Sequence, residues 1–400
     1  MTEASGTPSA RVCESGKQAE EAKRAKKWRW TEPAVWTARM LETLEQGVRG
    51  GKWFSLIDKV HSEKNLRAAY EKVRRNKGAP GVDHETVEHF GRQQTEKIRA
   101  LQEALSEGRY EPQAVRRVYI AKPGKREQRP LGIPTVQDRV VQAAMCNVLA
   151  PIFEKKFVEC SYGFRPRRSA KDALRQVTKK LHEGYRFVVD ADIQSFFDKI
   201  DHSILMELVR IEVADGRVLK LIEQLLKQGV LEDGDLRVPE EGAPQGGVLS
   251  PLLANIYLHE VDEAMSGKGW EIVRYADDLV VLCRTEAQAQ AALQMLHDLT
   301  HRIRLILHPE KTKIVDMNIP GARFTFLGYD FVTTKRDKHI RRYPNKKSRN
   351  RLRWRVKELT KRLNGHSLCT IIKRLNPVLR GWFQYFQHSS AGAMAPAELC

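Results

Sequence analysis

The sequence predicts an α+β fold in which an antiparallel sheet carries helices on one face and a helical region follows. Strand-like and helix-like segments interleave along most of the 400 residues, which favours a mixed sheet-and-helix core. Tight turns join several of the strands, and such turns suit antiparallel pairing better than a fully parallel sheet. From about residue 345 the pattern is helical only. With 41% hydrophobic residues, the chain can bury a large core.

The first 60 residues are predicted to form an N-terminal extension. Residues 1 to about 30 hold few large apolar groups, so we expect them to be poorly ordered. A helix is predicted in residues 32–48. The Gly-Ala-Pro-Gly run at 78–81 indicates a turn, and Asp83 is expected to cap the helix that follows it.

Residues 115–134 have the pattern of two strands joined by a basic loop. Cationic side chains in such a loop suit the phosphates of a nucleoside triphosphate. They are Lys122, Lys125, Arg126 and Arg129. An ordinary hairpin with solvated charges accounts for the pattern equally well, so these residues alone leave both interpretations open.

The middle of the chain alternates strands with helices. The β-branched residues of 187–193 indicate a buried strand, and Asp201 is placed to cap the helix after it. A glycine pair at 246–247 precedes a long helix, and a further helix is predicted over 286–303. Strands are predicted within residues 305–332.

The last region is helical and strongly basic. Leucines and a valine recur at helical spacing, and they form a narrow apolar stripe: Leu352, Val356, Leu359 and Leu363. Pro377 is expected to kink or start a helix. The net charge of the chain is +19, yet residues 334–390 alone contain 17 lysines and arginines against two acidic residues. Basic groups interleaved with aromatic rings predict nucleic acid as the partner. Aromatic rings packed in a core and charges on solvated helix faces would give the same pattern, and we expect both to contribute.

The cysteines and the apolar runs exclude several classes of protein. The six cysteines are scattered, none lies in a CxxC pair, and no histidine cluster has zinc spacing. Isolated cysteines fit a reducing compartment, so we expect a cytoplasmic protein. No apolar run reaches the roughly 18 to 20 residues that span a bilayer, and no signal peptide is recognisable, so no membrane partner is predicted.

Two adjacent carboxylates, Asp277 and Asp278, stand between two strand-like runs in the segment EIVRYADDLVVLC. On a regular strand they would point to opposite faces, but at the turn of a hairpin both can project near its tip. Adjacent carboxylates repel, and a divalent cation such as Mg²⁺ relieves this repulsion. A solvated turn is the plain alternative, because so short a motif is weak evidence.

A third carboxylate is expected on the strand at 187–193 or just after it. Asp190 and Asp192 point the same way along that strand, and Asp198 follows it, so periodicity does not choose among them. If one of them lies beside Asp277, the site can hold two metal ions. Two such ions would activate a primer 3′-hydroxyl and stabilise a leaving pyrophosphate.

The order of these motifs resembles the reverse transcriptases encoded by bacterial group II introns, which also act as maturases. The resemblance covers residues from about 60 to 388. It rests on segments that occur in the family's order: RPLGIPTVQDRVVQ, SYGFRPRRSAKDAL, DADIQSFFDKIDH, APQGGVLSPLLANIYL, YADD, HPEKTKIV, FLGYDF and LNPVLRGWFQYF. It implies a right-hand polymerase fold, with fingers and palm in residues 61–333. A helical thumb, or maturase X domain, follows in 334–390, and a tail occupies 391–400.

The resemblance also implies roles for individual residues. Asp192, Asp277 and Asp278 match the catalytic carboxylates, which would hold two Mg²⁺ ions together with the carbonyl of Ile193. The positions that match nucleotide-binding residues are Lys122, Arg129, Phe197, Gln245 and Lys311. Phe197 would exclude a ribose 2′-hydroxyl, although the neighbouring Phe196 leaves that assignment open. The positions expected to bind RNA are Arg353, Arg355, Lys357, Arg380 and Trp382.

The chain departs from the family's pattern at its end. Members usually continue past RGWFQYF with further thumb helix, and many add a zinc-bearing endonuclease. Here the sequence turns to SSAGAMAPAELC, so we expect a shortened thumb, and the paired cysteines of such a nuclease are missing. The shortened thumb puts the grip on RNA in doubt, whereas every palm motif is present.

The leading hypothesis is an RNA-directed DNA polymerase that also binds intron RNA and assists splicing and mobility. Its partners would be an RNA template, group II intron RNA, a DNA primer or target, and dNTPs. The alternatives are an RNA-binding splicing factor with little polymerase activity, a cyclic-nucleotide synthase and an inactive fragment. A relative recruited to host defence or DNA repair is a further alternative. The three intact aspartates argue against an idle site, and the basic thumb argues against the synthase.

Overall fold

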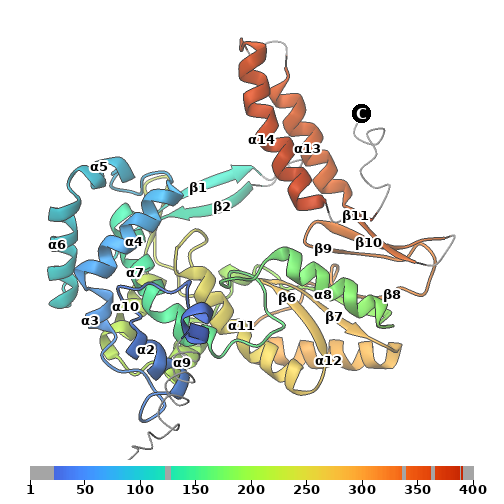
Figure 1. The fold of residues 1–400 in the computed structure, drawn as a ribbon, viewed down its shortest axis with the longest axis horizontal. Coiled ribbons are helices and arrows are strands. Elements are labelled where there is room, and N and C mark those ends of the chain that lie inside the picture. The colour runs from blue at the N-terminus through green and yellow to red at the C-terminus, as the bar shows by residue number, and fades with distance from the viewer. Residues whose placement is uncertain (1–21, 122–127, 336–338, 362–364, 388, 391–400) are drawn as a thin grey trace, which may run out of the picture.

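The computed structural model describes residues 22–121, 128–335, 339–361, 365–387 and 389–390. Three regions follow one another in space. A mainly helical finger region lies on the left of Figure 1, a sheet with flanking helices lies on the right, and a pair of helices rises above both. The mixture of helices with mostly antiparallel sheets confirms the predicted α+β fold.

The palm sheet has four antiparallel strands in the order β6-β7-β3-β8. They are β6 (Glu271–Tyr275), β7 (Asp278–Cys283), β3 (Phe187–Asp192) and β8 (Lys313–Asp316). The strands form where valine, isoleucine and leucine dominate, because these side chains pack well on a pleated surface. β3 and β7 are central, so both of their faces are buried.

Helices cover both faces of the palm sheet, and the expectation of helices on one face was wrong. Val189 and Val281 belong to the large core with α11 (Ser250–Gly267) and α12 (Glu286–Arg302). Val188 and Val280 belong to a second core with α8 (Ala170–His182). Successive strand residues point to opposite faces, and consecutive valines therefore need cover on both sides.

The finger region contains the sheet β2-β1-β4-β5 and most of the helices (Figure 1). The strands are β1 (Val115–Ala121), β2 (Gln128–Ile133), β4 (Val230–Glu232) and β5 (Asp235–Arg237). The helices of this region and of its junction with the palm are α3 (Ile57–Val60), α4 (Glu63–Asn76), α5 (Val87–Arg92), α6 (Gln94–Ser106), α7 (Val136–Glu154), η1 (Phe196–Asp198), α9 (His202–Glu212) and α10 (Gly216–Leu226).

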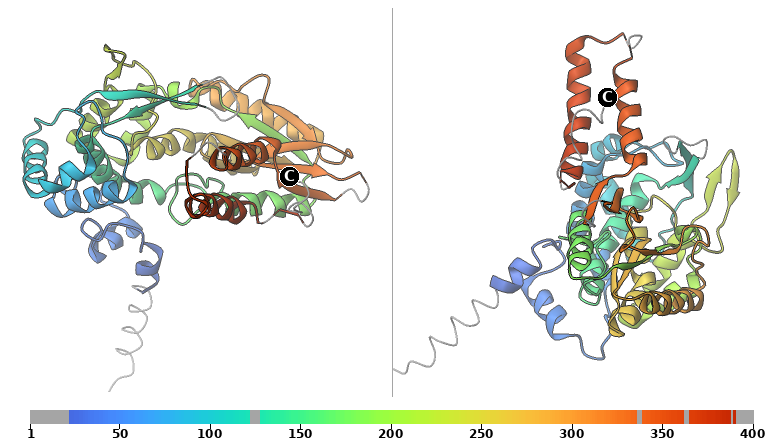
Figure 2. Two further views of the ribbon diagram at one scale, coloured as in Figure 1. Left: turned by 90° about the horizontal axis from the view of Figure 1, so that it is seen from above. Right: turned by 90° about the vertical axis from the view of Figure 1, so that its right-hand side faces the viewer.

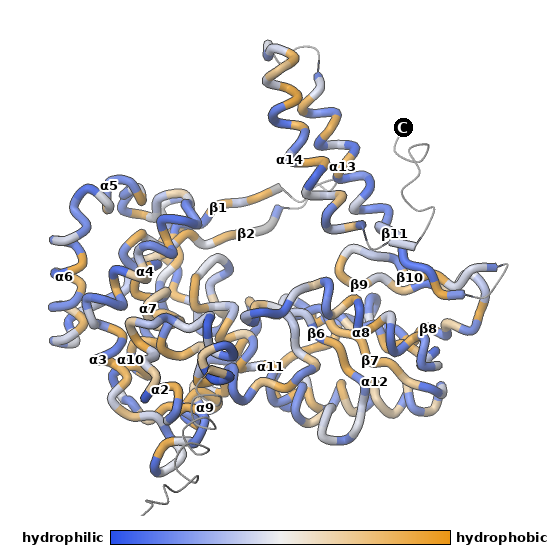
Figure 3. Tube along the Cα trace, in the orientation of Figure 1, coloured by the Kyte–Doolittle hydropathy of each residue, from blue (hydrophilic) through white to orange (hydrophobic). Residues whose placement is uncertain are grey.

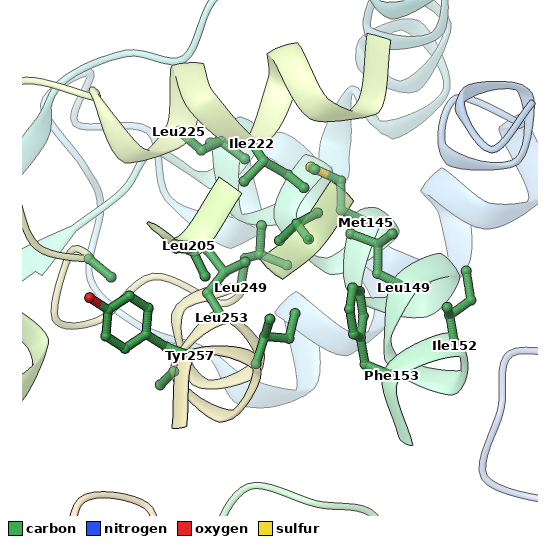
Figure 4. Close-up of a cluster of buried hydrophobic side chains, with 14 of the residues drawn as sticks. Met145, Leu149, Ile152, Phe153, Leu205, Ile222, Leu225, Leu249, Leu253 and Tyr257 are labelled. Carbon is green, nitrogen blue, oxygen red and sulfur yellow. The ribbon is translucent and has the colours of Figure 1, made fainter. Parts of the chain in front are cut away.

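Helix α7 is at the centre of the finger core. Figure 4 shows Met145, Leu149 and Phe153 of this helix among apolar side chains of α9, α10 and α11. The predicted strand-loop-strand at 115–134 is confirmed as β1 paired with β2. Asp201 caps α9 as predicted. Thr86, not Asp83, caps α5, because the cap must directly precede the first helical turn.

Residues 22–30 form a short helix followed by a turn, which corrects the predicted disorder of these residues. Trp28 and Trp36 are each only 3% exposed, and the indole of Trp36 donates a hydrogen bond to the carbonyl of Asn147 at 2.8 Å. α2 (Ala38–Gln46) is shorter than the predicted helix and is capped by Thr37. The buried tryptophan rings supply the apolar area that attaches this polar segment to the finger core.

A three-stranded sheet leads into the last two helices. It consists of β9 (Arg323–Phe326), β10 (Tyr329–Thr333) and β11 (Ile340–Pro344), followed by α13 (Lys346–Leu359) and α14 (Leu368–Phe386). Leu327 and Gly328 form the tight turn between β9 and β10, both with positive φ. Pro377 lies inside α14, which begins at Leu368, so this proline does not start a helix.

The pair α13 and α14 projects from the rest of the molecule, as Figure 1 and the right-hand view of Figure 2 show. Blue, hydrophilic segments predominate on α13, and orange ones recur along α14 (Figure 3). Phe386 at the end of α14 is buried against the three-stranded sheet, whereas Leu368 and Phe383 are exposed. Among the described helices, none is both long and apolar enough to cross a membrane.

Candidate active site

Three aspartates project from one face of the palm sheet. Asp190 and Asp192 lie two residues apart on β3, and the register places Asp192 directly opposite Asp278 of β7. Residues two apart on a strand share a face, and cross-strand partners share it too. The sheet therefore brings together carboxylates that are almost 90 residues apart in the chain.

Asp277 occupies the two-residue turn between β6 and β7. Tyr275 pairs with Asp278 across the hairpin, so Ala276 and Asp277 form its tip. Ala276 has a φ of 59°, which is the left-handed conformation that such a tight turn requires. The two adjacent aspartates thus project near the tip of a hairpin, as predicted from the segment YADD.

A cavity of about 460 Å³ lies in front of this turn, beside η1 and the end of β3. Its lining includes the predicted metal-binding and nucleotide-binding residues whose side chains are described, apart from Asp278. These are Asp192, Ile193, Phe197, Gln245, Asp277 and Lys311. The fold therefore gathers, around one opening, groups from five separate segments of the chain.

The carboxylates in this region are poorly compensated. Burial is the main factor that raises the pKa of Asp278, to about 7, and Asp190, Asp277 and Asp192 raise it further, while the Leu327 N–H lowers it. Burial likewise raises the pKa of Asp190 to about 6, against the opposing influence of Lys313. Excess negative charge at an open cavity is an electrostatic feature that a cation can relieve.

Stability should respond to this burial. Below about pH 3.8 Asp278 is protonated in both states, whereas between there and its folded pKa near 7 only the unfolded chain loses the proton. The free energy of unfolding should therefore fall as the pH rises through this range. With divalent ions chelated, Asp278→Asn should be more stable than the parent at pH 8, by on the order of 2 to 4 kcal/mol.

Urea unfolding at a series of pH values measures this difference. Asp298 is a matched control, since its side chain is 65% exposed on α12, and its Asn variant should follow the parent. A parent and an Asp278→Asn variant with parallel pH profiles would contradict the burial of a charged carboxylate at this site.

Lys311 contacts a carboxylate of this cavity directly. Its Nζ donates a hydrogen bond to Oδ2 of Asp192 at 2.6 Å. The amide of His308 also binds the carbonyl of Asp192, at 2.7 Å, and so ties the loop before β8 to the end of β3. Lys311 supplies positive charge beside the carboxylates, at a position where a substrate phosphate would also be attracted.

The two phenylalanines after Asp192 have different environments. Phe196 is buried in the core and packs edge-on against Phe197 at 5.2 Å between ring centroids. Phe197 is half-buried and lines the cavity. Both rings border the cavity, but Phe196 is 2% exposed, so Phe197 is the more accessible of the two.

Gln245 lines the same cavity, and its amide Nε2 donates to Asp198 at 3.2 Å. Asp198 was one of the carboxylates considered for the metal site, yet it lies on the Gln245 side of the cavity, in η1. Lys122 and the side chain of Arg129 lie outside the described residues. The backbone of Arg129 pairs with Ile120 in the finger hairpin.

Arg274 is a structural element of the site that sequence reasoning missed. Its guanidinium is 1% exposed and donates to both carboxylate oxygens of Asp262, to Asn255 Oδ1 at 3.0 Å and to Ser161 Oγ at 2.8 Å. It also donates to the carbonyl of Ala276 at 2.9 Å, so the buried guanidinium fixes the backbone of the turn that carries Asp277. The available signal was a charged residue that directly follows the apolar pair Ile272 and Val273 within a predicted strand.

The positions expected to bind RNA lie on α13 and α14. Arg353, Arg355 and Lys357 are exposed on α13, where Arg355 also pairs with Glu358 at 2.5 Å. Arg380 is exposed on α14. Trp382 differs from these, because it is half-buried and its ring lies 4.7 Å from that of Phe386. Its main contact is therefore with the second core, which leaves only part of its ring open to RNA.

Among the described residues, no group of three or more His, Cys, Asp or Glu side chains is already arranged around a metal position. The donor set nevertheless suits a hard cation. The available ligands are carboxylate oxygens and a backbone carbonyl, and the cavity that Asp192 and Asp277 line is open. Burial, with a smaller contribution from the neighbouring carboxylates, raises the pKa of Asp278, and a cation would favour its charged form.

Comparison with known proteins gives two family matches. The model for the reverse transcriptase (RNA-dependent DNA polymerase) family matches residues 120–331. The model for the group II intron maturase-specific domain matches residues 349–397. Together the two matches span the palm, part of the fingers and the basic helical pair.

Individual relatives agree with these matches. The chain is 37% identical over 249 residues to the group II intron-encoded protein LtrA of Lactococcus lactis subsp. cremoris. The aligned region covers 62% of this chain and 40% of that protein. It is 32% identical over 369 residues to protein YkfC of Escherichia coli, covering 81% of this chain and 91% of that one. The chain thus spans about two fifths of the Lactococcus protein. Among solved structures, a partial Cas6-RT-Cas1–Cas2 complex aligns with a TM-score of 0.40 at 24% identity, covering 62% of this chain and 42% of that one.

Proposed function

Because the chain belongs to the family of group II intron-encoded reverse transcriptases and maturases, we propose that it is an RNA-directed DNA polymerase. It would add dNTPs to the 3′-hydroxyl of a DNA primer on an RNA template. Its further partner would be a group II intron RNA, whose splicing and mobility it would assist.

One observation carries the proposal. Asp192 from β3 and Asp277 from the hairpin tip line the same cavity, together with Phe197, Gln245 and Lys311. Around a single opening, these side chains supply two carboxylates, an aromatic ring, an amide and a cation. Nucleotide addition combines positioning of the substrate with stabilisation of phosphate charge, and these groups can supply both.

Each residue has a role in this proposal. Phe197 would lie under the sugar and exclude a 2′-hydroxyl, because the ring is held against Phe196 and has little room to move. Gln245 would contact the incoming nucleotide, and its bond to Asp198 fixes the orientation of its amide. Lys311 would turn from Asp192 towards the phosphates. Lys122 and Arg129 would bind the triphosphate from the finger loop.

The residues that would hold two Mg²⁺ ions are Asp192, Asp277 and Asp278, with the carbonyl of Ile193. When bound, the ions would supply the Lewis acidity that activates the primer hydroxyl and offsets charge on the pyrophosphate. Asp278 also accepts a hydrogen bond from the Leu327 amide at 3.4 Å, which would connect the metal ligands to the turn between β9 and β10.

Primer extension tests the proposed activity. The purified chain is incubated with an RNA template annealed to a DNA primer, Mg²⁺ and dNTPs, and product length is read on a denaturing gel. Extension that requires both Mg²⁺ and the RNA template supports the proposal. Absence of extension, with a folded protein and tight primer–template binding, would contradict it.

The domain boundaries remain part of the proposal. Residues 61–333 would form the fingers and palm, and residues 334–390 the thumb or maturase domain, with residues 1–60 as an extension and 391–400 as a tail. The tail lies outside the described residues. The basic pair α13 and α14 would contact RNA, since it stands clear of the rest of the molecule (Figure 2).

Neutralising α13 should weaken RNA binding. The triple variant Arg353→Gln, Arg355→Gln and Lys357→Gln removes up to three phosphate contacts. Affinity for RNA should fall, and the slope of log K against log salt should become shallower by about 2 to 3. Filter binding at a series of salt concentrations measures both quantities. The matched control neutralises Lys23, Lys26 and Arg29 of the N-terminal segment, and an equal loss in that control would contradict the assignment to α13.

The second candidate function is that of a splicing factor with little polymerase activity. The match of residues 349–397 to the maturase-specific domain favours it. In that case the chain would bind intron RNA and accelerate its splicing. The Asp277→Asn variant would accelerate splicing as much as the parent does. Primer extension and splicing assays on the same two proteins separate the two functions.

A further inference from the structure

A phenylalanine beside the aspartate hairpin has an unusual combination of properties. Phe164 is 56% exposed and has a φ of 56°, in the left-handed region that side chains other than glycine rarely adopt. Its ring centroid lies 6.4 Å from that of Tyr275, the residue that precedes the hairpin tip. An exposed aromatic ring and a strained backbone each cost free energy, and neither cost is offset by packing of the ring itself.

The loop that presents Phe164 is attached to the aspartate hairpin. The amide of Tyr162 donates to the carbonyl of Arg274 at 2.8 Å, and Asn255 donates to the carbonyl of Gly163 at 2.9 Å. A Cβ atom on Gly163 would come within 2.3 Å of the backbone nitrogen of Ala276. The loop and the hairpin therefore pack backbone against backbone, and the position of Phe164 is coupled to that of Asp277.

The next residue anchors the loop from the opposite side. The side chain of Arg165 is 2% exposed and forms a bidentate pair with Glu154, with distances from 2.8 to 3.2 Å. It also donates to the carbonyls of Val158 and Ser161. With Arg165 held inward and Gly163 held against the hairpin, the residue between them must face solvent. The contacts of Gly163 and Arg165 thus fix the backbone on both sides of Phe164 and leave its ring exposed.

We propose that Phe164 is a stacking residue for a nucleobase of the bound primer–template, next to the reacting end of the duplex. This deepens the proposed polymerase function and rests on it. The ring lies near that of Tyr275, beside the turn that carries Asp277. Aromatic rings stack on any base through its π-face, so the contact would position the duplex without selecting its sequence. The strained, left-handed backbone of Phe164 would then be retained because it holds the ring in position for binding.

The test measures primer–template affinity without chemistry. In the Asp277→Asn background, without dNTPs, fluorescence anisotropy of a labelled DNA primer on an RNA template gives the Kd. Phe164→Ala should raise the Kd about 5- to 150-fold, whereas Phe164→Trp should stay within about threefold of the parent. Phe54→Ala is the matched control, because Phe54 is another exposed phenylalanine, at 58%, and its replacement should leave the Kd unchanged.

A second variant separates stacking from a structural role. Phe164→Gly relieves the left-handed strain, so its unfolding temperature should equal or exceed that of the parent while its Kd rises as in Phe164→Ala. Equal Kd values for all the variants would overturn the proposal. So would a Phe164→Gly variant that loses affinity only because it has become less stable.

Abasic nucleotides identify the strand. An abasic site placed in the template opposite the primer end should abolish the difference between parent and Phe164→Ala if the ring stacks on the template. An abasic primer end should do so if the ring stacks on the primer. A difference that survives in both substrates would overturn base stacking. If the parent does not extend the primer but binds primer–template through Phe164, only the proposed polymerase function is wrong. If the parent extends the primer and the Phe164 variants bind as tightly as the parent, only the stacking inference is wrong.

Discussion

Asp277→Asn should reduce primer extension by at least about a thousandfold. The change replaces a carboxylate at the tip of the hairpin by an amide of the same size, so the turn between β6 and β7 should keep its shape. The amide is a poor ligand for Mg²⁺ and removes one negative charge from the cavity that Asp277 shares with Asp192. Single-turnover extension on an RNA template measures the loss.

Two controls make this result specific. The Kd for primer–template and the unfolding temperature of Asp277→Asn should match those of the parent, because Asp277 lies at the surface of the cavity. Asp298→Asn, which removes an exposed carboxylate on α12, should extend primers at the parental rate. Activity within tenfold of the parent in Asp277→Asn would show that chemistry does not depend on this hairpin, and the proposed site would be wrong.

Arg274→Met should lower the free energy of unfolding by about 3 to 5 kcal/mol, a large effect for one substitution. Asp262 is fully buried and has Arg274 as its ion-pair partner. Without the guanidinium, its carboxylate keeps the cost of burial and loses the interaction that offset it. The same substitution removes the hydrogen-bond donor of the Ala276 carbonyl and of Asn255 Oδ1. Chemical denaturation of the purified protein measures the change.

The ion pair has an internal control. The double variant Arg274→Met with Asp262→Leu removes both charges and should recover a large part of the lost stability. Arg302 is 61% exposed and lies 3.6 Å from Glu260, so Arg302→Met should change stability by less than about 1 kcal/mol. A loss below about 1 kcal/mol in Arg274→Met would mean that this buried network does not support the aspartate turn.

Much of the local structure could be predicted from short stretches of sequence. The YADD hairpin, the Asp201 cap and the strand pair at 115–134 are all observed. The family motifs also led to the α+β fold and to the family, which the comparisons bear out. The roles of the metal ligands and of the nucleotide-binding and RNA-binding residues stay predictions until the variants are measured.

Two of the errors share a physical cause. Disorder was expected for residues 22–30 because the segment is polar, yet Trp28 is 3% exposed and belongs to a core built from residues far along the chain. Helices were expected on one face of the sheet, yet alternate residues of β3 and β7 are apolar on both faces and need two sets of partners. In each case burial depends on segments that local patterns do not reveal.

By itself the sequence indicated the strands at 115–134, 187–193 and around Asp277 and Asp278, several of the helices, and the aspartates that could serve a metal. Periodicity, capping and turn preferences act over a few residues, so they can be recognised in the chain as written. Only the tertiary structure decided that Asp192 stands opposite Asp278 and that Arg274 holds the turn from below. It also decided that Phe164 faces outward beside Tyr275. Those relations depend on strand register and on burial between residues up to more than 100 positions apart, and packing of the whole chain sets both.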